Sequence, residues 1–322
     1  MCYSAQIWAD YRRYVRDFGV ELSVREFYEL FWRRKGDPKV KIPKAVEAAF
    51  AVPASDIERE IKALIDEFAA EQEVKLQQEL FKQRKRLVDA ERTLQAKATK
   101  KAEEDKRIAT SKIEGALGKL SDLHRTEFID EDARIFPRYF APVMVVQDGK
   151  RVVRPMRFLC RPEGKPPDYD VKFPGLYNAR RDNLTRFWKD HWGYRHGIIV
   201  ANAFFENVDK HRAEGRELRE GEEVENVVLE FKPKPTQDML LACLWSDWKG
   251  QGGEPDLLSF ALITDEPPEE VAAAGHDRCV IPIKPEHVDA WLNPDPKNLA
   301  ALDAILDDRD RPYYEHRWLL AA

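Results

Sequence analysis

A stretch of 61 residues, from Ala54 to Glu114, contains neither glycine nor proline. These two residues most often interrupt regular structure, so their absence over such a length constrains this part of the chain to helix. Ser55 and Glu58 have the spacing of a capping box at its start. A single helix of this length would span about 90 Å at 1.5 Å per residue. We therefore expect the stretch to fold back as an antiparallel helical pair.

Apolar residues recur along this stretch at helical spacing. They are Ile57, Ile61, Leu64 and Phe68, followed by Leu80, Leu87, Leu94 and Ile108 on a seven-residue grid. Upstream, Ser23 and Glu26 form a second capping box, which predicts a helix that ends near Gly36. The sequence thus predicts a helical insertion over residues 21–124, in the form of a coiled-coil-like arm.

The sequence pattern changes from about Phe128 onward. Short β-branched and aromatic runs alternate with glycine and proline, as in the runs YFAPVMVV, HGIIVANAFF and MLLACLW. Their spacing of roughly 8–20 residues predicts a mixed, largely antiparallel and barrel-like β core. The expected fold class is therefore α+β, with the core formed by residues 1–20 and 125–322 around the inserted arm.

Composition excludes several classes of protein. No apolar run approaches the roughly 20 residues of a membrane helix, and the first residues lack the pattern of a secretory signal. The four cysteines are scattered without a CxxC pair, so we expect no disulfide framework and no zinc knuckle. His191 and His196 have no acidic partner at ligand spacing, so we expect no metal site, and no cofactor is expected. A cytoplasmic protein is the expectation. The net charge of −5 argues against coating nucleic acid by bulk charge but allows a local basic cleft.

Cys2 is the first candidate for chemistry. If Met1 is removed, Cys2 carries an amine and a thiol on adjacent carbons, with ordinary pKa values of about 7.7–8.0 and about 8.5. Such a pair attacks an aldehyde twice, first to give an imine and then to close a five-membered thiazolidine ring. The second attack is intramolecular and hence fast. The alternative is a cysteine that occupies position 2 without a role.

Three further motifs carry polar side chains next to predicted strands. Asn178 and Arg180 follow a turn; Asn178 offers an amide, and Arg180 a planar guanidinium group suited to phosphate. Glu206 follows an apolar run that is expected to be buried. His276 and Arg278 lie between two predicted strands. A carboxyl group in an apolar setting has a raised pKa suited to a general acid, and histidine can transfer protons near neutrality. Each could instead be an ordinary loop or edge-strand residue.

Between Arg151 and Val200 there are 11 Lys and Arg against 5 Asp and Glu, interleaved with aromatic residues. Basic and aromatic residues together suit single-stranded nucleic acid, because phosphates meet arginines and bases stack on rings. From this stretch, Arg157, Phe158 and Arg186 are expected to contact DNA.

In chain order, these pieces resemble the SOS-response-associated peptidase (SRAP) family. The matching pieces are Met1-Cys2, Phe140-Ala-Pro142, Asp148-Gly149, Met156-Arg157, Asn178-Ala-Arg180, Phe204-Phe-Glu206, Ala242-Cys-Leu-Trp245, Phe260–Thr264, His276-Asp-Arg278, Lys284-Pro285-Glu286 and Trp291-Leu292. The resemblance covers about residues 1–20 and 125–300. This chain departs from the family in reading Cys2-Tyr3-Ser4 at its start and in carrying the long helical insertion.

The resemblance implies covalent capture of abasic sites in single-stranded DNA by Cys2. It implies that Asn178 holds the thiol or the sugar, that Glu206 assists imine formation and later ring opening, and that His276 acts on a sugar hydroxyl. It assigns phosphate contacts to Arg180 and Arg278. The protein would then be a DNA-damage-response enzyme, cytoplasmic and nucleoid-associated when bound to DNA.

Two other functions stay open at this point. In one, Cys2 is the nucleophile of a cysteine peptidase with His276 or Glu206 as its base, and this activity could be confined to removal of Met1. In the other, the helical arm is the functional part and binds a protein partner or DNA, with the β core as a scaffold.

Overall fold

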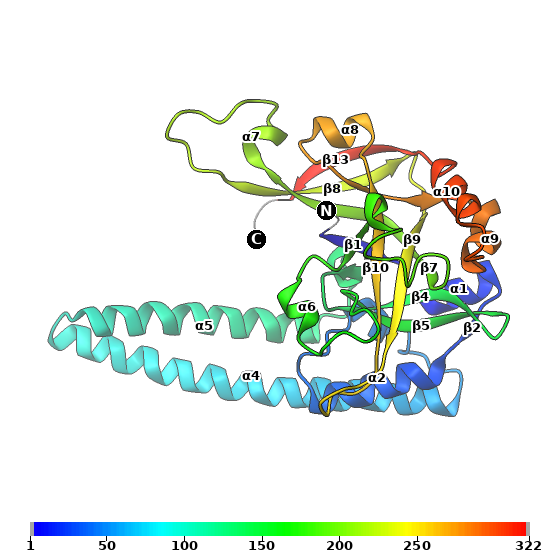
Figure 1. Cartoon of the computed structure of the whole chain (residues 1–322). Coiled ribbons are helices and arrows are strands. Elements are labelled where there is room, and N and C mark those ends of the chain that lie inside the picture. The colour runs from blue at the N-terminus through cyan, green and yellow to red at the C-terminus, as the bar shows by residue number, and fades with distance from the viewer. Residues whose placement is uncertain (1–2, 320–322) are drawn as a thin grey trace. The chain divides into compact units, whose positions relative to one another are not determined.

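The structure, a computed structural model, describes residues 3–319. The chain divides into two compact units, one formed by Met1–Val52 with Asp130–Ala322 and the other by Pro53–Ile129. The first unit contains the β-structure and the second is a pair of long helices (Figure 1). The strands are β1 (Ser4–Ile7), β2 (Glu21–Leu22), β3 (Arg134–Ile135), β4 (Phe140–Gln147), β5 (Lys150–Phe158), β6 (Asn178–Arg180), β7 (His196–Asp209), β8 (Asn226–Lys234), β9 (Met239–Trp248), β10 (Leu257–Asp265), β11 (Cys279–Val280), β12 (Pro282–Ile283) and β13 (Tyr313–Leu319).

Helices of the β-rich unit are shorter. They are α1 (Tyr11–Phe18), α2 (Val24–Gly36), α3 (Lys44–Ala48), α6 (Tyr169–Lys172), α7 (Lys210–Ala213), α8 (Glu269–Ala273), α9 (Val288–Leu292) and α10 (Leu299–Asp307), with 3-10 turns at Asp130–Ala133, Arg181–Asn183 and Pro285–His287. The helical unit contains α4 (Asp56–Ala96) and α5 (Lys100–His124).

Five strands of the β-rich unit close into a ring. Along the sheet, β9 pairs with β10, β10 with β5, β5 with β4 and β4 with β7, and an additional pairing of β7 with β9 completes the circle. Only the β10–β5 pairing within this ring is parallel. The ring confirms the mixed, largely antiparallel and barrel-like core and the α+β class expected from the sequence.

The barrel interior is packed with the apolar runs that the sequence singles out. Side chains of β4, β5, β7, β9 and β10 form one cluster, which includes Met156, Phe158, Ile199, Leu241 and Phe260, all fully buried. Gly197 lies where β4, β7 and β9 converge. A Cβ at this position would lie 3.0 Å from the Cys243 Sγ and 3.3 Å from the Met144 carbonyl, so a larger residue would push the strands apart.

Residues 21–52 belong to the β-rich unit, whereas the sequence analysis placed them in the insertion. An aromatic cluster accounts for the difference: the Phe50 ring lies 5.1 Å from Tyr11, 5.7 Å from Phe27 and 5.6 Å from Phe31. The helix α2 ends at Gly36 as expected. Ser23 makes no side-chain capping bond, and the Glu26 carboxylate pairs instead with Arg154 of β5.

In the helical unit, α4 and α5 form an antiparallel hairpin (Figure 1). Ion pairs set its register, since Lys112 lies opposite Glu79, and Arg86, further along α4, lies opposite Asp105, earlier in α5. The α5 side of the contact is formed by Ala102, Ala109 and Ala116, seven residues apart and buried. Small side chains at this spacing let two helices approach closely over a seam with few large apolar groups.

The predicted start of α4 is confirmed. Ser55 accepts a hydrogen bond from the Glu58 backbone N–H at 3.3 Å, while the Glu58 carboxylate accepts one from the Ala54 N–H at 2.6 Å. The turn between the helices falls at residues 97–99, which the sequence did not locate. Within residues 3–319, neither long helix has an apolar stretch capable of crossing a membrane.

Candidate active site

The first described residues lie against the second half of β7. β1 pairs antiparallel with β7, so that Ser4 lies opposite Phe205 and Ala5 opposite Phe204. Tyr3 donates its backbone N–H to the Phe205 carbonyl at 3.2 Å. Cys2, the expected nucleophile, lies outside the described residues. Tyr3, the residue to which Cys2 is bonded, contacts β7 at Phe205, directly before Glu206.

Glu206 and His276 form a buried pair. The Glu206 side chain has no exposed surface, His276 is 9% exposed, and the His276 Nε2 lies 3.3 Å from a Glu206 carboxyl oxygen. The other ring nitrogen, Nδ1, lies 2.8 Å from the Arg278 carbonyl. A proton on Nδ1 donates to that carbonyl and leaves Nε2 as an acceptor that faces the carboxyl group. The structure thus brings together two residues that the sequence places 70 positions apart.

Burial shifts both groups of this pair toward their neutral forms. Burial raises the pKa of Glu206 to about 8, and a hydrogen bond from the Tyr3 backbone N–H acts in the opposite direction. Burial likewise lowers the pKa of His276 to about 4. At neutral pH the pair is therefore a carboxylic acid and a neutral imidazole. A protonated carboxyl group in a dry setting is a proton donor suited to general acid catalysis.

A tight turn presents His276 to Glu206. The helix α8 ends at Ala273, and Gly275 then adopts a φ of +93°, which favours glycine. A Cβ on Gly275 would lie 2.8 Å from the Cβ of Arg212, so the turn is also pressed against the segment that follows β7. Beside this turn lies a cavity of about 430 Å³ whose lining includes His276, Asp277, Arg212 and Arg216.

Two short strands flank the end of β10 and carry the remaining candidates. β6 runs parallel to β10, with Asn178 opposite Leu262 and Arg180 opposite Thr264. β11, which follows Arg278, pairs with the other edge of β10 at the same Thr264. Neighbouring strands lie about 4.8 Å apart, so Thr264 holds the two segments within about 10 Å of each other. Asn178 is 6% exposed at this edge.

Arg180 and Arg278 share one carboxylate. A Nη2 atom of Arg180 lies 3.0 Å from the Asp182 carboxylate, and a Nη2 atom of Arg278 lies 3.6 Å from the same oxygen. Asp182 is 58% exposed, so the anion that joins the two guanidinium groups is open to solvent. Asp182 is not among the residues predicted from the sequence, although an acid two residues after Arg180 is the signal that would have found it.

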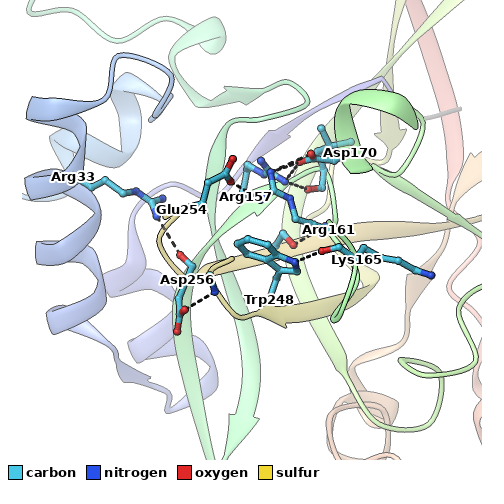
Figure 2. Close-up of polar contacts among 11 residues, drawn as sticks. Arg33, Arg157, Arg161, Lys165, Asp170, Trp248, Glu254 and Asp256 are labelled. Atoms are coloured by element: carbon cyan, nitrogen blue, oxygen red, sulfur yellow. Dashed lines mark hydrogen bonds and ion pairs between the residues drawn. The ribbon is translucent and has the colours of Figure 1, made fainter. Parts of the chain in front are cut away.

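The side chain of Arg157 lies in a buried ionic network (Figure 2). It pairs with Asp170, which is 2% exposed and also meets Arg161 at 3.2 Å. A Nη2 atom of Arg157 also donates to the carbonyl of Leu159 at 3.0 Å. Leu159 has a φ of +133°, which is strained for leucine, so the network braces this backbone. These contacts make Arg157 a structural residue and correct the expectation that it contacts DNA.

Phe158 is fully buried and stacks on Phe260 at 5.2 Å within the barrel. It has no face for a nucleic-acid base, so the expectation that it contacts DNA is also corrected. Trp188 and Trp192 of the same stretch are also buried and cannot stack on a base. Much of the basic charge in this stretch pairs with acids elsewhere in the chain, as Arg154 does with Glu26 and Arg181 with Asp265. Of the three residues expected from this stretch, Arg186 is exposed.

Within residues 3–319, no group of three or more histidine, cysteine or acidic side chains is placed to hold a metal ion. The three described cysteines, Cys160, Cys243 and Cys279, are buried. Burial raises the pKa of each thiol, that of Cys160 to about 12, so none is a ready thiolate at neutral pH.

We expect the buried acid to show in the pH dependence of stability. The folded state holds the Glu206 proton up to pH about 8 and the unfolded state releases it at its ordinary pKa of 4.5, so stability is lost as the pH rises toward 8. The lowered pKa of His276 affects stability only below pH about 6.5, the ordinary pKa of histidine in the unfolded state. From pH 6.5 to 8, denaturant unfolding should show a decline that is absent in Glu206→Gln. Equal slopes in both proteins would mean that Glu206 is ionised when folded.

Comparison with known proteins supplies the family. The model for SOS response associated peptidase (SRAP) matches residues 92–317 of the chain, a range that includes Asn178, Glu206 and His276. No curated protein matches. Several solved structures do, at low identity.

A protein from Bordetella bronchiseptica is 18% identical, with 59% of this chain and 88% of that chain covered and a TM-score of 0.45. A protein from Bacteroides thetaiotaomicron is 15% identical, with 60% and 80% covered and a TM-score of 0.44. A phage-related protein from Bordetella bronchiseptica is 17% identical, with 61% and 85% covered and a TM-score of 0.43. On the match to the family model, the chain belongs to the SOS response associated peptidase (SRAP) family, and this membership supports a general role in processing abasic sites in damaged DNA.

Proposed function

We propose that this protein captures abasic sites in single-stranded DNA covalently, through the amine and thiol of Cys2 once Met1 has been removed. One observation carries the proposal: the buried pair of Glu206 and His276 lies where Tyr3, the residue bonded to Cys2, meets β7. The buried state of the other three cysteines supports Cys2 as the nucleophile.

The chemistry uses the neutral state of that pair. An opened abasic sugar presents an aldehyde; the Cys2 amine adds to its carbon, and the resulting hydroxyl leaves as water when the imine forms. Glu206, protonated at neutral pH, donates the proton that this leaving hydroxyl requires. The thiolate then adds to the imine carbon, the nitrogen takes a proton, and a thiazolidine ring closes. In the reverse reaction the lone pair of the ring nitrogen expels the sulfur, which Glu206 can protonate as it leaves, and water then hydrolyses the imine to the aldehyde and the free amine.

The other candidates position the sugar and the strand. His276, neutral and held by the Arg278 carbonyl, presents its Nε2 to the Glu206 carboxyl and can relay a proton between that carboxyl and a sugar hydroxyl. Asn178 offers a neutral donor and acceptor at the edge of β10. Arg180 and Arg278 converge on one carboxylate, an arrangement that a phosphate could replace, and Arg186 is exposed to meet a further phosphate.

Loss of the Cys2 side chain should abolish the covalent product. Cys2→Ala removes the thiol that closes the ring, so no denaturation-resistant species should form on abasic single-stranded oligonucleotide, while noncovalent binding persists through the arginines. Gel electrophoresis after heating in detergent measures the adduct. Cys160→Ala is the matched control, because its thiol is buried and should leave the adduct unchanged. An adduct formed by Cys2→Ala would move the nucleophile elsewhere, and Met1 retained in active protein would contradict the mechanism.

Replacement of the acid should slow the reaction without abolishing binding. Glu206→Gln keeps the size of the side chain but cannot supply a proton, so adduct formation should slow by about 10²–10⁴-fold, as for other general acids. The rate of the wild-type protein should also fall above pH about 8, where Glu206 ionises, and the variant should lack this decline. Single-turnover kinetics from pH 6 to about pH 9 test both. A rate equal to wild type would leave Glu206 a structural residue.

Asp182 should oppose DNA binding. Its carboxylate occupies the space between Arg180 and Arg278 in which a phosphate would bind, and an exposed ion pair of this kind is worth only about 0–1 kcal/mol. Asp182→Asn should therefore bind undamaged single-stranded DNA more tightly, by several-fold, with a steeper dependence on salt. Fluorescence anisotropy gives both quantities. Asp190→Asn, an equal change of charge on an exposed residue nearby in sequence, should have less effect. Unchanged affinity in Asp182→Asn would place the phosphate elsewhere.

A further inference from the structure

The distal part of the α4–α5 hairpin, residues 81–113, is basic in an acidic protein. It contains 11 Lys and Arg against 5 Asp and Glu, whereas the whole chain has a net charge of −5. We call this part the distal hairpin. It lies in the helical unit, and the active site uses none of its residues.

Ion pairs neutralise only part of this charge. Arg86 pairs with Asp105 at 2.5 Å, Lys106 with Glu91 at 3.2 Å, and Arg107 with Glu104 at 2.6 Å. Six exposed basic residues make no ion pair within the described part of the chain: Lys82, Arg84, Lys85, Lys97, Lys100 and Lys101. Like charges held this close raise one another's energy, and an anion would relieve that repulsion.

A cleft runs along the side of the distal hairpin where these charges gather. It has a volume of about 670 Å³, and its basic lining is Lys82, Lys85, Arg86, Lys101 and Lys112. On α4 it extends from Lys82 to Thr93, about 16 Å at 1.5 Å per residue. Phosphates of one strand lie about 3.4 Å apart along a duplex axis and further apart in an extended single strand, so this length can hold a few successive phosphates. The lining also contains two acids, Asp89 and Asp105, and both already have a basic partner, Arg92 at 3.9 Å and Arg86 at 2.5 Å.

An exposed aromatic ring borders the basic residues. Phe81 is 75% exposed and precedes Lys82 directly, and Lys85 lies one helical turn further on. Rings flanked by basic residues form the usual platform on which bases of a single strand stack, and a duplex offers no such free base face.

We propose that the distal hairpin binds single-stranded DNA, with the phosphates in the basic cleft and a base on Phe81. The inference rests on the proposed function, which makes single-stranded DNA the substrate, and gives the helical insertion a second contact with that strand. An acidic protein segment would satisfy the charge of the cleft, but a nucleic acid carries a flat ring beside every one of its anionic groups, so Phe81 next to the basic residues favours nucleic acid.

The test compares two variants with an equal change of charge in the full-length protein. Lys82→Gln, Lys85→Gln and Lys101→Gln together remove three cations of the cleft, and Lys62→Gln, Lys75→Gln and Lys119→Gln together remove three exposed or partly exposed cations outside it. The probe is undamaged oligothymidylate of about 30 nucleotides, longer than the roughly 4–16 nucleotides of one single-strand site. Fluorescence anisotropy at several salt concentrations measures the affinity.

The cleft variant should bind this probe at least tenfold more weakly than wild type at low salt. Its log–log salt dependence should flatten by about two, because each lost phosphate contact contributes about 0.7 on a single strand. The control variant should change neither quantity as much. Phe81→Ala should weaken binding of the single strand by about fivefold or more but leave a duplex of equal length unaffected, whereas Val88→Ala should have little effect. Circular dichroism verifies that each variant keeps its helices.

Three outcomes would overturn the proposal. Equal affinity of the cleft variant and wild type would exclude the cleft, an equal loss for duplex and single strand would exclude stacking on Phe81, and displacement of the hairpin-dependent binding by polyglutamate as readily as by oligothymidylate would point to an acidic protein. Adduct formation on an abasic oligonucleotide of about eight nucleotides, within the size of one site, is measured in parallel. If that adduct fails to form in wild type, the proposed function fails, independently of the result on undamaged DNA.

Discussion

The strand β7 is the element on which the rest of the structure depends. Its first half pairs with β9 from His196 to Ala201 and contacts β4 at Ile198, which closes the barrel. Its second half leaves the ring and pairs with β1 and β8, so that Glu206 lies between the start of the chain and the body of the sheet. One continuous strand therefore transmits the rigidity of the barrel to the acid of the candidate site, which is how a general acid keeps a fixed position.

Burial gives this acid its chemistry. The Glu206 carboxyl faces the His276 ring, and burial keeps that ring neutral as well. In a charged pair the proton would lie on the imidazole, and the Glu206 carboxylate could not itself donate one. The neutral pair keeps the proton on the carboxyl group up to pH about 8, close to the pH at which an amine begins to be a free nucleophile. In the proposed mechanism, both partners of imine formation are then available together.

The sequence predicted the elements that depend on local pattern. The absence of glycine and proline predicted α4 and α5, and the alternating apolar runs predicted the strands of the barrel. The motif containing Glu206 and the motif containing His276 could be singled out, but their contact could not, because it depends on the register of β7 against β1 and on the turn at Gly275. The aromatic cluster around Phe50 likewise joins 21–52 to the β-rich unit through contacts that no local pattern records.

The arginines show most clearly where sequence reasoning ends. Arg157 and Arg180 lie in one basic stretch and look alike in the sequence, but their acid partners differ in burial: Asp170 is 2% exposed and Asp182 is 58% exposed. Breaking a buried pair leaves an uncompensated charge and costs about 3–5 kcal/mol, whereas an exposed pair contributes about 0–1 kcal/mol and exchanges readily for another anion. A phosphate can therefore displace Asp182 from Arg180 but not Asp170 from Arg157. The burial of the acid, more than the count of basic residues, therefore separates the arginines proposed to bind DNA from those that stabilise the fold.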